Sequence, residues 1–288
     1  MKTINSYMFE CHGHIMLDGA GYGAAAERHK NGVDEAAVRR ALAECAQRGI
    51  VFYRDGGDIY NVSVFAKKIA AEYGIDYRTP VFMIHKRGCY GSMFGPGFES
   101  AAGYRALVGR AAELGADFIK LAVSGIMDFG GDGKPTGPAL SESETRELMN
   151  IAHGEGFAVM AHVNGARAIL SALEAGADSI EHGYWPGGET VDAMLQAGAV
   201  WTPTRAAVSN LTGTGAYSAE VLSRVLDAQA RRLSEAYARG VPIASGSDCG
   251  ALAVPQGAGT LDEYRLLGEL GIDPARGNER VALLFKRS

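Results

Sequence analysis

Two histidines that lie two positions apart are the first residues of the chain that could do chemistry. His12 and His14 end a short apolar run, Phe9-Glu10-Cys11-His12-Gly13-His14. Side chains at positions i and i+2 of an extended strand share one face, so this pair could bind one metal ion. A chance pair of histidines at a solvated strand end would look the same, and the rest of the chain decides between the two interpretations.

Other residues that could bind a metal or move a proton stand at the ends of further short apolar runs. They are Asp55, His85, Lys120, His162, His182, Thr204, Arg205 and Asp248. A nitrogen and oxygen ligand set suited to zinc or a similar divalent ion is formed by His12, His14, Lys120, His162, His182 and Asp248. Each histidine alone could be an ordinary hydrogen-bonded residue, but their shared position at strand ends is improbable by accident.

A repeated pattern of helix, glycine and short strand must position these residues. Seven glycines stand where a helix end needs a left-handed conformation, and they are Gly49, Gly74, Gly115, Gly156, Gly176, Gly198 and Gly240. The strands predicted after them cover residues 50–53, 80–84, 117–120, 157–161, 179–181, 199–202 and 241–244. These runs are mostly apolar without strict alternation, which is typical of parallel strands covered on both faces.

Segments of helical periodicity between the strands complete the fold prediction. Apolar stripes such as the one from Val221 to Leu233 would face a sheet, and Ser141 and Glu144 fit a capping box that opens a helix. Eight strands alternating with helices predict a single-domain α/β protein, a (β/α)8 barrel over residues 1–288. A doubly wound open sheet is the alternative, and the absence of a GxGxxG motif after the first strand counts against it.

The barrel prediction places the strand-end residues together. Barrel enzymes build their active sites at the C-terminal ends of the strands, where all these side chains would converge. Two glycine-rich loops, residues 15–31 and 127–140, follow the first and fourth strands and are expected to form a mobile rim over the substrate. Simple surface excursions are the alternative for both loops.

The composition limits the partners and the compartment. A net charge of −5 gives no basic surface for nucleic acid or anionic lipid, and no segment approaches the ~18 apolar residues of a membrane span. The four cysteines are scattered without a CxxC pair, which favours reduced thiols in a cytoplasmic protein. A small-molecule substrate is therefore the expected partner, and a homo-oligomer is left open.

The strand-end motifs resemble those of the amidohydrolase superfamily of metal-dependent hydrolases. The matching motifs cover nearly the whole chain in the right order, and they are Cys11-His12-Gly13-His14, Phe118-Ile119-Lys120-Leu121, Met160-Ala161-His162, Ile180-Glu181-His182-Gly183 and Gly246-Ser247-Asp248. The segments Tyr53-Arg54-Asp55-Gly56-Gly57, Ile119-Lys120 and Ser179-Ile180-Glu181-His182-Gly183 are similar to the prolidase-like branch. Members of that branch hydrolyse Xaa-Pro dipeptides and N-acyl amino acids.

Two features depart from that branch. Its members usually carry a small β-sandwich built from both chain termini, whereas here the first strand begins within the first ten residues, so the sandwich is expected to be missing. The third-strand region, residues 84–90, lacks the glycine-histidine motif of the branch. This second departure puts the substrate in doubt rather than the chemistry.

The resemblance implies a binuclear centre with two divalent ions, with zinc as the expected metal. His12, His14 and Asp248 would hold one ion, His162 and His182 the other, and Lys120 would bridge them as an N-carboxylated side chain. An ammonium has no lone pair, so the amine must be neutral before it takes up carbon dioxide. The ions would share a hydroxide, and Asp248 would act as general base and acid, returning the proton to the leaving nitrogen.

Substrate contacts are predicted from position. Tyr184 and Arg205 would reach a carbonyl oxygen or a carboxylate, and His85, Lys86, Arg87 and Tyr90 are alternatives. For each of them a solvated or packing role is at least as probable, and Asp55 is expected to be a structural hydrogen-bond partner.

The predicted function is hydrolysis of a C-N amide bond in a small molecule, with an Xaa-Pro-like dipeptide or an N-acyl amino acid as the leading substrate. A deaminase or a lactone hydrolase of the same superfamily is the first alternative, and Lys120 counts against the mononuclear deaminases. A metal-dependent binding protein that has lost catalysis is the alternative from another class.

Overall fold

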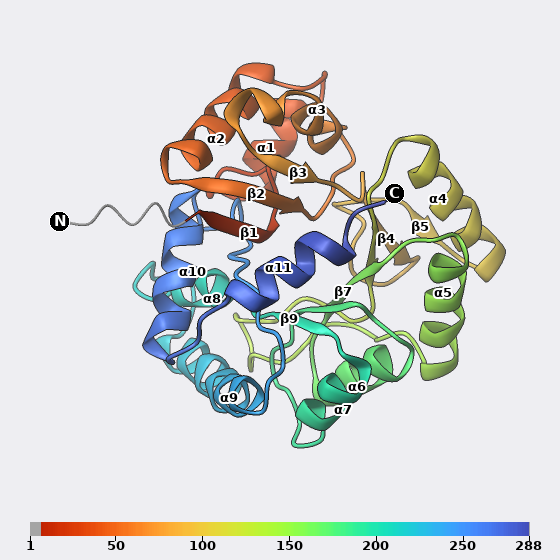
Figure 1. The fold of residues 1–288 in the computed structure, drawn as a ribbon, viewed down its shortest axis with the longest axis vertical. Coiled ribbons are helices and arrows are strands. Elements are labelled where there is room, and N and C mark those ends of the chain that lie inside the picture. The colour runs from red at the N-terminus through yellow and green to blue at the C-terminus, as the bar shows by residue number, and fades with distance from the viewer. Residues whose placement is uncertain (1–6, 288) are drawn as a thin grey trace.

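The structure is a computed structural model that describes residues 7–287. The predicted domain spans residues 1–288, so residues 1–6 and Ser288 lie outside the described part of the chain. Parallel strands form the centre of the molecule, helices surround them, and α11 (Ala275–Leu284) lies across one end of the strands (Figure 1).

The strands form two parallel sheets. The first sheet has the order β1 (Met8–Gly13), β2 (Ile50–Asp55), β3 (Asp76–Arg78). The second has the order β5 (Gly97–Phe98), β4 (Met83–Lys86), β6 (Ile119–Ala122), β7 (Val159–Val163), β8 (Ser179–His182), β9 (Val200–Thr202). Every pair of neighbouring strands is parallel, as expected when helices connect them.

Two irregular segments join these sheets into a closed ring. Residues 76–86 contain both β3 and β4, and they pair with β2 on one side and with β6 on the other. Residues 242–249 lie between β9 and β1: Trp201 N donates to Pro242 O at 3.0 Å, and Cys11 N donates to Ser245 O at 2.8 Å. The prediction of an α/β fold built as a (β/α)8 barrel is confirmed.

The predicted third and eighth strands differ from the structure. The run expected over residues 80–84 is broken, because Pro80 has no N–H to donate and Val81 has φ 70°. The run expected over residues 241–244 makes only one isolated bridge, between Ile243 and Trp201. Pro242 removes a donor there too, and the segment holds its place through single hydrogen bonds on both sides.

The helices are α1 (Tyr22–His29), α2 (Glu35–Gln47), α3 (Val62–Ile69), α4 (Ala101–Glu113), α5 (Glu142–Gly154), α6 (Ala166–Glu174), α7 (Thr190–Ala197), α8 (Arg205–Ser209), α9 (Ala219–Ala238), α10 (Ala258–Glu269) and α11. The capping box of Ser141 and Glu144 is confirmed at the start of α5. All seven predicted turn glycines have positive φ values, from 63° at Gly198 to 94° at Gly176. None of the helices described within residues 7–287 has the length and apolarity to cross a bilayer.

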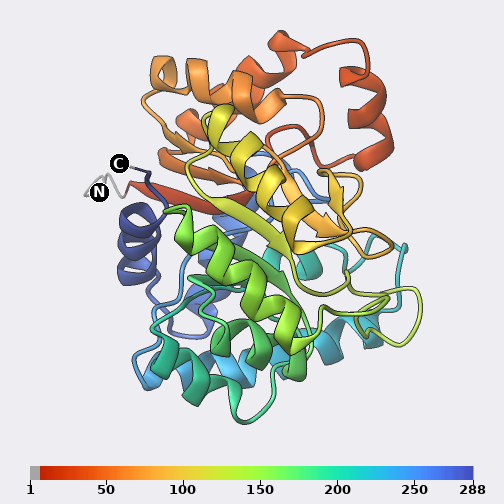
Figure 2. The same ribbon diagram turned by 90° about the vertical axis from the view of Figure 1, so that its right-hand side faces the viewer.

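The two ends of the barrel are different. At one end Val281 of α11 and Phe285, which follows the helix, pack with Phe118, which precedes β6, and with Met160 of β7, and this cluster fills the interior. At the other end lie α1 and the loop of residues 127–140 (Figure 2). The segment expected as a loop over residues 15–31 contains the helix α1. The C-terminal ends of the strands meet at this open end of the barrel.

Candidate metal centre

One cavity of about 240 Å³ at the C-terminal end of the strands gathers the predicted metal ligands. The residues of this set that line the cavity are His12, His14, Lys120, His162, His182 and Asp248. They come from β1 and the residue after it, from β6, β7 and β8, and from the segment that follows α9. The structure thus brings together side chains that are up to 236 positions apart in the chain.

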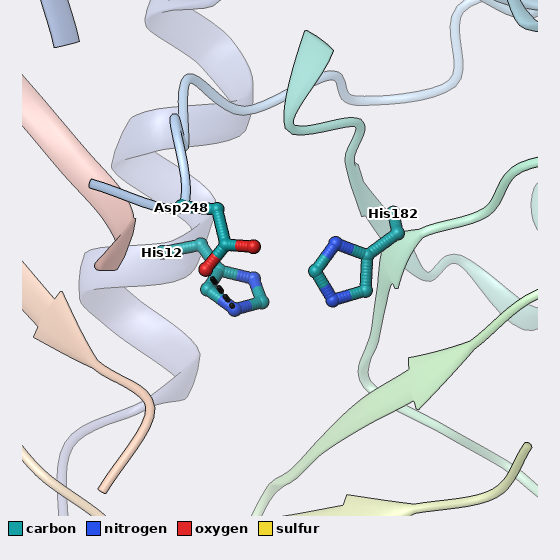
Figure 3. Close-up of side chains that lie close together, drawn as sticks. All are labelled: His12, His182 and Asp248. Carbon is teal, nitrogen blue, oxygen red and sulfur yellow. Dashed lines mark ion pairs between the residues drawn. The ribbon is translucent and has the colours of Figure 1, made fainter. Parts of the chain in front are cut away.

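The ligand atoms of this cluster are close enough to share metal ions. Asp248 Oδ1 lies 3.6 Å from His14 Nε2 and 3.8 Å from His12 Nε2. His12, His182 and Asp248 each offer one ligand atom, and these atoms lie within 4.8 Å of one another (Figure 3). The rings of His162 and His182 have their centroids 4.5 Å apart. This group could hold a metal ion.

Hydrogen bonds on the outer side of the cluster orient three of the imidazoles. His12 Nδ1 lies 2.7 Å from Glu181 Oε2, and His182 Nδ1 lies 2.8 Å from Thr204 Oγ1. His162 Nε2 lies 3.3 Å from the carbonyl oxygen of Gly125. Each bond occupies one ring nitrogen and leaves the other ring nitrogen to bind a metal ion. Metal-binding histidines usually have this arrangement. The residues therefore fit a metal centre.

The protonation states of the cluster also suit a metal. Burial and, to a lesser extent, neighbouring Lys120 lower the pKa of His14 and of His162 to about 3. Burial also lowers the pKa of His12 and of His182 well below 6.5. The imidazoles are therefore neutral near pH 7, and a neutral imidazole has the lone pair that a divalent ion requires.

Packing rather than hydrogen bonding positions His14. Its ring lies against Phe94, with centroids 4.5 Å apart. On the other side, a Cβ on Gly56 would lie 2.2 Å from His14 Cε1, so only glycine leaves room for the ring. The glycine at position 56, directly after β2, is thus required by the position of the His14 ring.

A buried ion pair below the cluster was missed by sequence reasoning. Arg54 Nη2 donates to Glu181 Oε1 at 2.8 Å, and both side chains are fully buried. Arg54 Nε also donates to Cys11 O at 2.6 Å, and its guanidinium lies 4.3 Å from the centroid of Phe285. The guanidinium supplies a counter-charge for the Glu181 carboxylate, whose other oxygen holds His12. The network therefore fixes the orientation of a ligand.

A second buried acid, Glu10, joins β1 to the segment that carries Asp248. Its carboxylate accepts hydrogen bonds from His12 N at 3.0 Å, Ser247 N at 2.9 Å, Ser247 Oγ at 2.6 Å and Thr260 Oγ1 at 2.6 Å. Burial raises its pKa to about 7, against the lowering effect of these bonds. The signal that could have identified Glu10 is a charged residue inside an apolar strand, two positions before a ligand on the same face.

Asp55 has the structural role that the sequence predicts. It accepts hydrogen bonds from Ile15 N at 2.9 Å, Gly57 N at 2.6 Å and the Tyr77 hydroxyl at 2.6 Å. These donors occupy both oxygens and tie the loop after β1 to the end of β2. Asp55 thus supports the wall of the cavity without lining it.

Of the three predicted substrate contacts, one lines the cavity and two do not. Tyr184 lines the cavity, but its hydroxyl donates to Thr204 O at 2.7 Å. Arg205 follows Thr204, whose φ is 49°, and turns toward α9, where Nη1 donates to Gln229 Oε1 at 3.2 Å. His85 is buried, with Nδ1 2.9 Å from Lys86 O. Neither Arg205 nor His85 is among the described residues that line the cavity.

The alternative substrate contacts from the third-strand region also include residues inside and outside the cavity lining. Lys86 pairs with Glu144, and Arg87 pairs with Glu99 at 3.0 Å. Tyr90 lines the cavity, and its ring lies 4.6 Å from that of His162. Of this region's predicted contacts, Tyr90 is therefore the one positioned to meet a ligand.

Comparison with known proteins gives one family. The sequence matches the profile described as "Amidohydrolase family" over residues 22–276. Ochratoxinase of Aspergillus niger is 27% identical over 278 residues, which cover 84% of this chain and 57% of that protein. An uncharacterised protein of Mycobacterium tuberculosis is 31% identical over 153 residues, which cover 51% of this chain and 40% of that protein. The chain thus spans less than two thirds of the length of these relatives.

Solved structures share the fold. An Xaa-Pro dipeptidase with methionine bound in its active site has a TM-score of 0.76 at 21% identity, and the match covers 96% of this chain and 72% of that one. The crystal structure of A. niger ochratoxinase has a TM-score of 0.76 at 20% identity, and the match covers 97% of this chain and 71% of that one.

Proposed function

Since this chain belongs to the amidohydrolase family, we propose that it is a metal-dependent hydrolase that cleaves the C–N bond of an amide in a small molecule. The observation that carries this proposal is the convergence of six nitrogen- and oxygen-bearing side chains on one cavity. Dipeptides of the Xaa-Pro type and N-acyl amino acids are the substrates to which the sequence motifs point. The name of one structural neighbour, an Xaa-Pro dipeptidase, supports an amide substrate, because a peptide bond is an amide.

The proposed centre holds two divalent ions, with zinc as the expected metal. Bound there, the ions would supply Lewis acidity that polarises a carbonyl group and lowers the pKa of a water molecule. We assign the residues to the two ions as the sequence motifs imply. His12, His14 and Asp248 would hold one ion, His162 and His182 would hold the other, and Lys120 would contact both.

The position of Lys120 supports a carboxylated side chain. Its Nζ lies 3.0 Å from His12 Nε2, the side chain is fully buried, and no carboxylate of residues 7–287 lies within ion-pair distance of it. A buried ammonium without a partner is costly, and burial lowers the Lys120 pKa to about 8. The neutral amine would form an N–C bond to carbon dioxide and release a proton. The resulting carbamate carries a negative charge and two oxygens that can bind metal.

Asp248 is proposed to move the proton. Its side chain is 19% exposed and lines the cavity, and Oδ1 lies within 4 Å of the Nε2 atoms of His12 and His14. Burial raises its pKa to about 6, against the lowering effect of Lys120, which brings it nearer to neutrality. Asp248 would take a proton from the attacking water and give it to the amide nitrogen as the C–N bond breaks. The products are a carboxylic acid and an amine.

Turnover of a substrate panel tests this function. We expect purified, zinc-loaded protein to hydrolyse amides from a panel of dipeptides, N-acyl amino acids, uncharged N-acyl amides, lactones and aminopurines. Chelation should abolish that turnover, and added zinc should restore it. Turnover of the lactones or aminopurines alone would move the assignment to another reaction of the superfamily. No turnover across the panel by metal-replete protein would favour a binding protein that has lost catalysis.

A further inference from the structure

Apolar side chains form the wall of the cavity above the metal cluster. They come from the loop after β1, from β4 and its following loop, and from the loop after β6. The largest of them are Leu17, Met83, Met93, Phe94, Met127 and Phe129. A wall of this kind gains free energy by covering apolar substrate surface, at about 25 cal/mol per Å² removed from water. The substrate should therefore present an aromatic or bulky aliphatic group.

The rim of the cavity is apolar as well. Met93, Ile126 and Leu252 line the cavity, and yet 37%, 46% and 41% of their surfaces are exposed. Large apolar side chains that gather on an exposed rim usually mark a binding site. A substrate that enters here meets apolar surface from three different loops before it reaches the ligands.

The polar groups of the wall cannot neutralise a charged substrate. Among the described lining residues there is no arginine, and the single lysine is Lys120 in the metal cluster. The Asn164 amide donates to Gly125 O at 3.2 Å and accepts from Tyr184 N at 3.1 Å, and as a neutral group it supplies no counter-charge. Arg205, the residue expected to bind a substrate carboxylate, donates to groups of α9 instead. Away from the metal cluster, the lining offers a free carboxylate neutral donors such as the Tyr90 and Tyr217 hydroxyls but no cation, so its charge would lose water without gaining a counter-charge.

We propose that the substrate is an uncharged N-acyl amide with an aromatic or bulky aliphatic acyl group, and that substrates with a free carboxylate are discriminated against. This inference rests on the proposed amide hydrolysis and names its substrate class. It differs from the dipeptides and N-acyl amino acids that the sequence motifs suggest, because the wall offers no counter-charge for the carboxylate that both carry.

A pair of matched substrates tests the proposal. Zinc-loaded protein is given N-benzoylglycine and N-benzoylglycinamide, and cleavage of the same benzoyl–nitrogen bond is followed. We expect kcat/KM to be at least about tenfold higher for the uncharged carboxamide, because it leaves no charge to desolvate. Exchange of benzoyl for acetyl in the carboxamide should lower kcat/KM by a similar factor. Equal or better turnover of the free acid would overturn the proposal and leave amide hydrolysis standing.

An added cation at the rim should weaken the preference for the uncharged substrate. Leu252→Arg is expected to raise kcat/KM for N-benzoylglycine relative to its carboxamide by about tenfold. Leu261→Arg is the matched control, because Leu261 is also 41% exposed but lies on α10 outside the cavity lining. The control adds the same charge and should leave the ratio unchanged. A shift of equal size in both variants would show that overall charge, rather than the cavity wall, sets the preference.

Equilibrium binding separates the substrate class from the reaction. If wild-type protein hydrolyses neither compound, the other amides of the panel decide whether the proposed function fails, and binding decides the substrate class. The zinc-loaded Asp248→Asn variant should bind the carboxamide more tightly than the free acid. This variant lacks the negative charge of Asp248, so a preference that persists comes from the wall. Tighter binding of the free acid would overturn the proposed class.

Discussion

The Asp248→Asn variant is expected to lose at least about 100-fold in kcat while it keeps zinc at least in part. Asparagine retains an oxygen that can contact a metal, but it cannot take a proton from water or give one to the leaving nitrogen. The loss should therefore lie in the chemical step rather than in substrate affinity alone. Initial rates over a range of substrate concentrations give kcat and KM, and elemental analysis of the same sample gives the metal content.

Asp192→Asn is the matched control for this variant. Asp192 is an exposed residue of α7 that lies outside the cavity lining, and its carboxylate pairs with Arg239. The same change of charge there should leave kcat unaltered, since exposed ion pairs contribute little. Near-normal turnover by Asp248→Asn with full metal content would contradict the role of Asp248 in proton transfer.

The Lys120→Ala variant is expected to lose most activity, by at least about 100-fold, because it would remove a proposed metal ligand rather than a residue that only orients one. A short carboxylic acid such as acetate or propionate should restore part of the activity, since it can place a carboxylate where the side chain was. Zinc content should fall together with activity. The measurement is turnover and metal content with and without added carboxylate.

Two further observations distinguish a carboxylated Lys120 from an ordinary one. Lys68→Ala is the control, because Lys68 is an exposed lysine of α3, and neither activity nor carboxylate response should change there. Labelled bicarbonate should give a carbamate signal in wild-type protein that Lys120→Ala lacks. A crystal structure of active, metal-replete enzyme with an unmodified Lys120 would contradict the carbamate and leave a single ion held by His12, His14 and Asp248.

Much of the barrel could be predicted because its signals are local. Each turn glycine, such as Gly49 or Gly240, occupies a position with positive φ, and Ser141 caps its helix through a contact three residues away. The spacing of His12 and His14 follows from the period of one strand. Once the strands are known to be parallel, their C-terminal ends must share one side, and this brings distant ligands such as His162 to the same cavity.

The parts that the sequence did not reveal depend on contacts between distant elements. Arg205 stands after a strand like the ligands do, but the left-handed Thr204 turns it toward Gln229 on α9. Glu181 adjoins a ligand in the chain, and only the fold shows that it also holds His12 and Arg54. Whether a side chain at a strand end points into the cavity depends on local backbone angles. The sequence pattern that predicts a strand end does not predict these angles.

Metal titration of chelated protein tests the central claim most directly. Zinc is added in small steps to metal-free protein, and bound metal and amide hydrolysis are measured on the same samples. We expect activity to appear with metal and to reach its maximum near two zinc ions per chain. Full activity near one ion per chain would contradict the binuclear centre, and full activity without bound metal would contradict a metal-dependent hydrolase altogether.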